Sequence, residues 1–204
     1  MSQNSSTTPN SKTEKKKREN TPHKKQPKKI TATYLHNSGL YYLQRYAASS
    51  GHFREVMLRK IKKSCMAHPE QNIEYCIPLL DELIEKFMTV NLLDDQSYVT
   101  GMVNTMRRKG KSAKAIHNHL RNKRVPPQAI EDALASFDHE NDETSAETEF
   151  KAAIIYARKK RLGPYKGEKE IDPQKELARM ARAGFAYDTS RRVLNMNEEE
   201  IVEH

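Results

Sequence analysis

The chain of 204 residues is 36 % hydrophobic and 31 % charged, with 2 cysteines and no tryptophan. This composition argues against a large buried core and a disulfide scaffold, and it favours small cores with extended surfaces. The formal net charge is +9, but residues 1–29 alone hold nine Lys or Arg against two Glu, so the rest of the chain is nearly neutral.

The N-terminal segment, residues 1–29, is polar and rich in lysine. We expect it to be disordered, because it has no apolar side chains with which to build a core. It lacks the apolar core of a secretory signal, and no apolar run in the chain approaches the roughly 20 residues that cross a bilayer, so we expect a cytoplasmic protein without membrane contact. Its Lys-Lys-Lys-Arg run at 15–18 is either a salt-sensitive arm that binds DNA or part of a solubilising extension.

Residues 34–92 show the 3.6-residue apolar period of three helices. The first helix ends at Ser49-Ser50-Gly51, and the third runs from about Ile73 to Val90. The predicted buried stripes are Leu40, Leu43 and Ala47 in the first helix, Phe53, Met57 and Ile61 in the second, and Ile77, Leu80, Leu83, Ile84 and Phe87 in the third.

Residues 93–134 contain three further helical patterns, separated by two breaks. Asp94 or Asp95 is a good N-cap for the first helix, and Ser112 caps the second. Pro126-Pro127 ends the second helix and opens the third, because proline fits a first helical turn. The inward-facing residues are Tyr98, Met102 and Met106, then Ile116 and Leu120, then Ile130, Ala133 and Leu134.

The same helix order recurs after residues 138–149, an acidic and polar stretch that is either a linker or an extended helix start. Asp172-Pro173 predicts a helix start, and Gly184 suits a left-handed helix end. A shift of 60 residues aligns three pairs of apolar positions: Leu120 with Met180, Val125 with Phe185, and Leu134 with Leu194. Such self-similarity is typical of repeat proteins. We therefore predict an all-α, elongated array of three tandem three-helix repeats with these domains: a disordered basic tail (1–29), repeats at 34–92, 93–138 and 144–196, and an acidic C-terminal tail (197–204).

Two local patterns resemble metal sites without meeting the requirements of one. Cys65, His68 and Cys76 lack a fourth ligand at a usual spacing, and structural zinc sites need four. His117 and His119 are two residues apart on a helix and point in nearly opposite directions, so they cannot share an ion or act as an acid-base pair. We expect free thiols, surface histidines and no metal.

Gly110-Lys111-Ser112 resembles the end of a phosphate-binding loop. A Walker loop needs glycine five residues before Gly110, where this chain has Thr105, and it should follow a buried strand. No other catalytic fingerprint is present. We therefore expect a protein that is not an enzyme and has no cofactor.

Basic residues gather in two clusters near helix ends. Each cation taken alone has a plain explanation, because cations complement the negative end of a helix dipole and stay solvated. Clusters on successive repeats, however, can line one face of a rod and meet a negatively charged partner. The candidate contact residues are Arg107, Arg108, Lys109, Lys111, Lys114, Arg121, Lys123 and Arg124 in the centre, with Arg158, Lys159, Lys160 and Arg161 later.

Two stretches resemble the RecX family of bacterial regulators. The first consists of Leu93-Asp94-Asp95-x-x-Tyr98 followed by Arg108, Gly110, Ile116, Leu120, Lys123, Val125, Ile130 and Leu134. The second consists of Arg182-Ala183-Gly184-Phe185-Ala186-Tyr187 followed by Arg191, Arg192, Val193 and Leu194. The sequence departs from the family pattern at Arg124, where glycine is usual, and at Ser190, where an apolar residue is usual.

The resemblance implies three tandem three-helix repeats and a partner, the recombinase RecA with its RecA–DNA filament. It further implies inhibition of recombinase, coprotease and ATPase activities, and so a role in recombination, DNA repair and the SOS response. We expect a monomer. Two alternatives stay open: a direct DNA-binding protein with helix-turn-helix-like units, in which Asn118, Arg121 and Asn122 approach base edges, and a basic adaptor that does not contact RecA.

Overall fold

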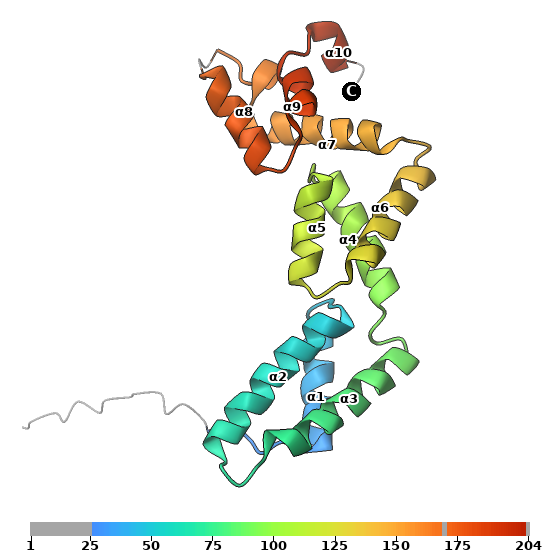
Figure 1. Ribbon diagram of the computed structural model, residues 1–204, viewed down its shortest axis with the longest axis vertical. Helices are drawn as coiled ribbons and strands as arrows, with labels where there is room; N and C mark the ends of the chain where they lie inside the picture. The colour runs from blue at the N-terminus through green and yellow to red at the C-terminus, as the bar shows by residue number, and fades with distance from the viewer. Residues whose placement is uncertain (1–25, 169–170, 203–204) are drawn as a thin grey trace, which may run out of the picture.

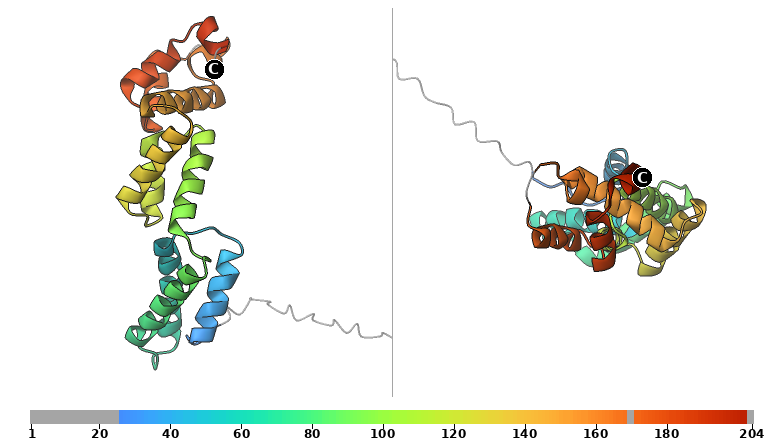
Figure 2. Two further views of the ribbon diagram at one scale, coloured as in Figure 1. Left: turned by 90° about the vertical axis from the view of Figure 1, so that its right-hand side faces the viewer. Right: turned by 90° about the horizontal axis from the view of Figure 1, so that it is seen from above.

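The computed structural model describes residues 26–168 and 171–202, and within them every regular element is helical. The helices form a long, narrow molecule in which three groups follow one another along the chain (Figure 1, Figure 2). The predicted all-helical array of three tandem repeats is therefore confirmed. The predicted disorder of residues 1–29 falls almost wholly outside the described residues. None of the described helices has the length and apolar character needed to cross a membrane.

Repeat 1 contains three helices, α1 (Ala32–Leu43), α2 (Ser50–Ala67) and α3 (Ile73–Thr89). Each begins after a side chain that accepts an amide hydrogen of the first turn, from Thr31, Ser49 and Asn72 respectively. The prediction that Ala47 continues the first helix is wrong, because α1 ends at Leu43 and Ala47 is exposed. The residues between them form the turn that brings Ser49 into its capping position.

Repeat 2 contains α4 (Asp95–Arg108), α5 (Ala113–Asn122) and α6 (Pro127–Glu140). The helices begin as predicted, with the Asp94 carboxylate accepting from Ser97 and the Ser112 hydroxyl accepting from the Ala115 amide. Helix α6 starts at a proline, whose missing amide hydrogen costs nothing in a first turn. These local signals explain why the central repeat was well predicted.

Repeat 3 contains α7 (Ser145–Lys160), the short 3-10 helix η1 (Gly163–Tyr165), α8 (Pro173–Arg182) and α9 (Tyr187–Leu194). Thr144 and Glu147 form a capping box at the start of α7, so only residues 141–144 connect it to α6. The predicted acidic tail contains a further helix, α10 (Glu198–Val202), and its Ile201 packs against the core of repeat 3.

Each repeat has its own small hydrophobic core. Within the described residues, their buried members include Phe53, Leu80 and Phe87 in repeat 1, Val103, Ile116 and Leu120 in repeat 2, and Ile154, Met180 and Phe185 in repeat 3. Apolar periodicity had placed Phe53, Leu80 and Phe87 of repeat 1 and Ile116 and Leu120 of repeat 2 on inward faces. We propose that the three groups are the domains of the protein, predicted at 34–92, 93–138 and 144–196, although α1 already starts at Ala32 and α6 extends to Glu140.

Consecutive repeats are connected by a polar joint, which we call joint 1 between repeats 1 and 2 and joint 2 between repeats 2 and 3. In joint 1 the hydroxyl of Ser49, the N-cap of α2, donates a hydrogen bond to the Lys123 carbonyl at the end of α5. In joint 2 the hydroxyl of Ser112, the N-cap of α5, donates to the Ala183 carbonyl at the end of α8, at 2.6 Å. In both joints, the start of the second helix of one repeat is thus hydrogen-bonded to the end of the second helix of the next repeat.

A carboxylate from the first helix of the following repeat completes each joint. Asp95 accepts a hydrogen bond from the Ser50 amide at 2.6 Å, and Glu149 accepts one from the Ala113 amide at 2.9 Å. Both amides belong to a first helical turn, where the intrahelical acceptor is missing, and the carboxylate also favours the positive end of the helix dipole. The same local chemistry therefore fixes each repeat against the next.

Candidate interaction face

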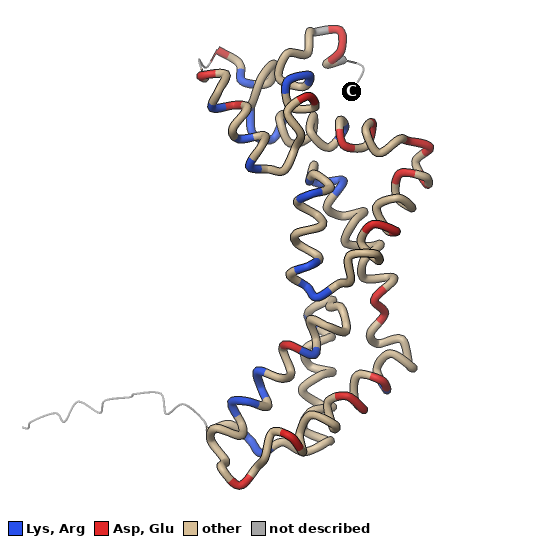
Figure 3. The backbone as a smooth tube through the Cα atoms, in the orientation of Figure 1, with Lys and Arg blue, Asp and Glu red and all other residues tan. Residues whose placement is uncertain are grey.

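The second helices of the three repeats, α2, α5 and α8, lie along the same side of the molecule, and Lys and Arg gather on that side (Figure 1, Figure 3). Helix α2 carries five Lys or Arg against one Glu, and α8 carries three against one. Residues 111–124, which include α5, carry five basic residues and no acid. We call this side the basic face.

Acidic residues follow the third helices of repeats 1 and 2 instead. Helix α3 holds four Asp or Glu against one Lys, and α6 holds four with no Lys or Arg. Figure 3 shows them on the opposite side from the basic face. The array is therefore a rod with one positively charged side and one negatively charged side. The electric field of these sides would orient a charged partner before it makes contact.

Arg107 is not part of the basic face. Its side chain is buried, with the residue only 3 % exposed, and its Nη1 donates to Glu149 Oε2 at 2.6 Å and to the Lys111 carbonyl at 3.3 Å. The expectation that Arg107 is a surface contact is therefore wrong. It belongs to joint 2, and no local pattern indicates this pairing because Glu149 is 42 residues away.

The other central candidates divide between the open surface and joint 1. Lys123 is half-buried, with its Nζ 3.3 Å from His52 Nε2, and Arg124 pairs with Glu55 at 2.8 Å. The pKa of His52 is lowered by burial and further by Lys123, which reflects the positive charge at this joint. The exposed candidates without a carboxylate partner among the described residues are Arg108, Lys109, Lys111, Lys114 and Arg121.

The later cluster lies at the end of α7, where it meets the loop between α4 and α5. Lys159 Nζ donates to the Lys109 carbonyl at 3.1 Å, although the two residues are 50 positions apart in sequence. The Arg158 guanidinium lies over the Tyr165 ring at 5.4 Å, and Arg161 ends the helix in a left-handed conformation. The fold thus brings the two predicted basic clusters together at joint 2.

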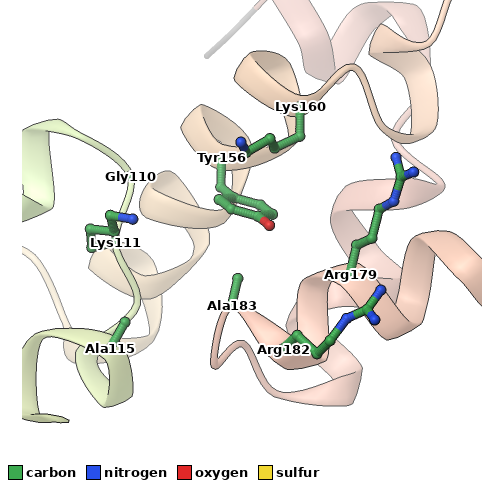
Figure 4. A pocket seen from close by; sticks show the side chains of 8 residues that line it. All are labelled: Gly110, Lys111, Ala115, Tyr156, Lys160, Arg179, Arg182 and Ala183. Atoms are coloured by element: carbon green, nitrogen blue, oxygen red, sulfur yellow. The ribbon is translucent and has the colours of Figure 1, made fainter.

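A basic hollow of about 390 Å³ opens at this meeting point. Lys160 and Tyr156 come from α7 and Arg179 and Arg182 from α8, while Lys111 faces them from repeat 2 (Figure 4). The full lining is Gly110, Lys111, Ala115, Tyr156, Lys160, Arg179, Arg182 and Ala183.

Sequence analysis missed the contribution of α8 to this hollow. Arg179 and Arg182 are three residues apart, so they project from one face of the helix. That spacing was visible in the sequence, but it is also explained by cations complementing the end of a helix dipole. Only the packing of α8 beside the α4–α5 loop shows that these two side chains share a site with Lys111.

The patterns that resembled other sites have structural roles. Ser112 cannot serve a phosphate loop, because its hydroxyl is buried and engaged in joint 2. Cys65 and Cys76 are free thiols, and burial raises the pKa of Cys76. Across the part of the chain that the structure describes, no group of three or more His, Cys, Asp or Glu is placed to hold a metal ion.

Comparison with known proteins gives the same architecture. Residues 94–134, which span α4 to most of α6, match the model of the second three-helix domain of RecX. The regulatory protein RecX of Myxococcus xanthus (strain DK1622) is 35 % identical over 185 residues, which cover 89 % of this chain and 94 % of that protein. The chain belongs to the RecX family.

Further relatives agree with this assignment. The regulatory protein RecX of Agrobacterium fabrum (strain C58 / ATCC 33970) is 29 % identical over 182 residues, covering 86 % of this chain and 89 % of that protein. The crystal structure of RecX from Lactobacillus salivarius matches with a TM-score of 0.55 at 20 % identity, covering 85 % of this chain and 97 % of that one. At this identity the structural match shows the shared fold. The resemblance found from two sequence motifs is confirmed, and this RecX family member is similar to proteins named as regulators.

Proposed function

We propose that this chain is a monomeric, non-enzymatic regulator that acts in the cytoplasm by binding along the RecA–DNA filament. It inhibits recombinase, coprotease and ATPase activities, and so modulates DNA repair and recombination. Membership of a family of regulatory proteins supports the proposal. The observation that carries it is the basic face, which extends over all three repeats and is complementary to a long, negatively charged partner.

The exposed apolar residues support a partner that includes protein as well as nucleic acid. Among the described residues, the large exposed apolar side chains are Tyr41, Tyr46, Met66, Tyr75, Met88, Val90 and Leu92 in repeat 1 and Tyr187 in repeat 3. Met88, Val90 and Leu92 lie together at the end of α3. Apolar groups of this kind anchor protein–protein contacts. A nucleoprotein filament offers partners for both kinds of surface.

The deciding experiment measures ATP hydrolysis by RecA on single-stranded DNA as the protein is added. Binding of the protein alone to the same DNA is recorded in the same buffer by fluorescence anisotropy. We expect inhibition at concentrations well below those at which the protein coats free DNA. Absence of inhibition would contradict the proposal, and inhibition only at DNA-coating concentrations would favour direct DNA binding.

A matched pair of charge reversals tests whether the basic face makes the contact. Lys114 lies on this face in α5, and Lys86 lies on the acidic side in α3, and both are exposed. Because reversing Lys114 replaces an attraction with a repulsion, Lys114→Glu should raise the concentration for half-inhibition by roughly fivefold at moderate salt. Lys86→Glu, which changes the net charge equally, should leave it almost unchanged. Equal effects would mean that net charge, and not the basic face, governs binding.

A second candidate function is sequence-specific DNA binding through α5. Asn118, Arg121 and Asn122 are exposed on this helix, and side chains of these types contact base edges in the major groove. This function predicts that unlabelled duplexes of different sequence compete with clearly different affinity. Equal competition by all duplexes would leave only contacts to the phosphate backbone, as the filament proposal expects.

A further inference from the structure

The basic hollow concentrates positive charge without local compensation. Four of its eight lining residues are cations, and none is acidic. They come from three separate segments, namely the α4–α5 loop, the end of α7 and the last turns of α8. Like charges held together in this way repel one another. Binding of an anion would remove that repulsion.

The cations of the hollow differ from many other basic residues in having no acidic partner. Elsewhere, carboxylates pair with Lys29, Arg54, Arg107, Arg124, Lys151 and Lys166. Among the described ion pairs and side-chain hydrogen bonds, none involves the side chains of Lys111, Lys160, Arg179 or Arg182. These four side chains are also exposed, so their donors are available to a ligand.

We infer that the basic hollow is a binding site for the phosphate backbone of a nucleic-acid strand. The planar guanidinium groups of Arg179 and Arg182 suit bidentate hydrogen bonds to phosphate oxygens, and the two lysines add charge at the rim. The half-buried ring of Tyr156 lies between Lys111 and Arg179 and offers a surface on which a base can stack (Figure 4).

The surroundings favour a nucleic-acid strand over a small anion or an acidic protein. Sites for small molecules are mostly apolar and enclosed, whereas half of the residues that line this hollow are exposed cations. Protein partners rely on exposed apolar anchors, and none of the large exposed apolar residues lines the hollow. The hollow lies between α5 and α8, which both belong to the basic face, so a polymer with regularly spaced phosphates can contact the hollow and the face together.

This site deepens the proposed function by naming the DNA backbone as one of the two partners within the filament. It rests on the proposed function for its biological setting. The binding itself is tested without RecA. If the hollow does not bind DNA, the proposal that the protein regulates RecA therefore still stands. If the protein does not inhibit RecA, the inference that the hollow binds DNA still stands.

The test compares two double variants of the full chain in binding to a fluorescent oligothymidylate. One variant, R179Q/R182Q, removes two charges from the hollow. The control, K86Q/R191Q, removes two charges from exposed positions on α3 and α9, outside both the hollow and the basic face. We expect the hollow variant to raise Kd about tenfold or more. The slope of log Kd against log salt concentration should fall by the amount that roughly two lost phosphate contacts account for, while the control changes Kd by less than about threefold.

Two further measurements locate the binding and identify the ligand class. Lysine acetylation followed by mass spectrometry should show Lys111 and Lys160 protected by the oligonucleotide and Lys86, on the acidic side, unprotected. Polyglutamate and tripolyphosphate, at equal concentrations of charge, should compete less well than unlabelled oligothymidylate. Circular dichroism checks that both variants keep their helix content.

Several outcomes would overturn the inference. Equal weakening by the two double variants would assign the binding to diffuse charge, and lack of protection at Lys111 and Lys160 would place the strand elsewhere. Competition by polyglutamate as strong as that by DNA would identify an acidic protein as the ligand. Equally strong competition by tripolyphosphate would identify a small phosphate anion.

Discussion

Joints 1 and 2 have the same geometry but different chemistry. Each uses an N-cap serine, a first-turn amide and a carboxylate, yet joint 2 also buries the Arg107–Glu149 ion pair, whose side chains are 2 % and 18 % exposed. The ion pair of joint 1, Arg124 with Glu55, is 62 % and 41 % exposed. One joint therefore depends on a pair shielded from water, while the other carries a pair that water screens.

The backbones of the joints differ in a related way. The residue after the α8 C-cap is Gly184, with φ +95°, and the corresponding residue after the α5 C-cap is Arg124, with φ +61°. A Cβ at Gly184 would lie 2.5 Å from Ser112 Oγ, whereas Arg124 accommodates its own Cβ opposite Gly51. In joint 1 the glycine lies on the facing helix. Both joints therefore have a close approach that a glycine permits. In joint 2 the glycine is Gly184, which belongs to the later repeat, whereas in joint 1 it is Gly51, which belongs to the earlier repeat.

The largest predicted effect is at the buried ion pair. Glu149→Ala leaves the Arg107 guanidinium buried without its carboxylate, which should cost about 3–5 kcal/mol of unfolding free energy in urea denaturation. Glu55→Ala, the matched change in joint 1, should have a much smaller effect because its partner Arg124 remains solvated. Similar losses for both variants would show that burial of the pair does not distinguish the joints.

A smaller effect is expected where the backbone is left-handed. Gly184→Ala places a methyl group against Ser112 in a conformation that disfavours side chains, so we expect a loss of roughly 2 kcal/mol and a lower Tm. Arg124→Gly should change the Tm little, because the relief of left-handed strain offsets the loss of the Glu55 pair. A marked loss of stability in Arg124→Gly would show that its ion pair, and not its backbone, governs joint 1.

The smallest effect is a pH dependence that arises at His52 in joint 1 and at His119 on α5. Burial first, and then Lys123, hold the pKa of His52 below 6.5, with Arg59 adding to the shift and Glu55 opposing it. The unfolded chain therefore takes up the proton more readily, so stability is complete above about pH 6.5 and declines as the pH falls below it. His119 shifts in the same direction through burial, Lys123 and Lys111.

Urea denaturation at pH 7.5 and pH 5.5 measures this dependence. We expect H52Q/H119Q to lose less stability than the wild-type chain on acidification. His117 provides the control substitution on the same helix as His119. If H117Q flattens the pH dependence as much as the double variant does, the effect does not arise at His52 and His119.

The helices could be predicted because their signals are local. Ser112, Asp94 and Asp172 each act within three residues of their own position, and apolar periodicity places the three cores. The joints could not be predicted, because Ser49 bonds 74 residues away and Ser112 bonds 71 residues away. The candidate site could be predicted only in part, because it also combines local patterns with contacts between residues distant in sequence. Its lysines belong to runs of basic residues that are evident in the sequence. Arg107, however, pairs with Glu149, and the arginines of α8 reach the hollow only because α8 packs beside the α4–α5 loop.

The N-cap of α8 differs from those of α2 and α5 in a way that concerns assembly. Ser49 and Ser112 each carry a hydroxyl that donates to the following repeat, whereas α8 is capped by Asp172, whose side chain acts as an acceptor for the Gln174 amide. A further repeat, or a second molecule stacked end to end, could not dock on α8 by the same bond. The cap of α8 therefore lacks the donor with which α2 and α5 each hold the repeat that follows them.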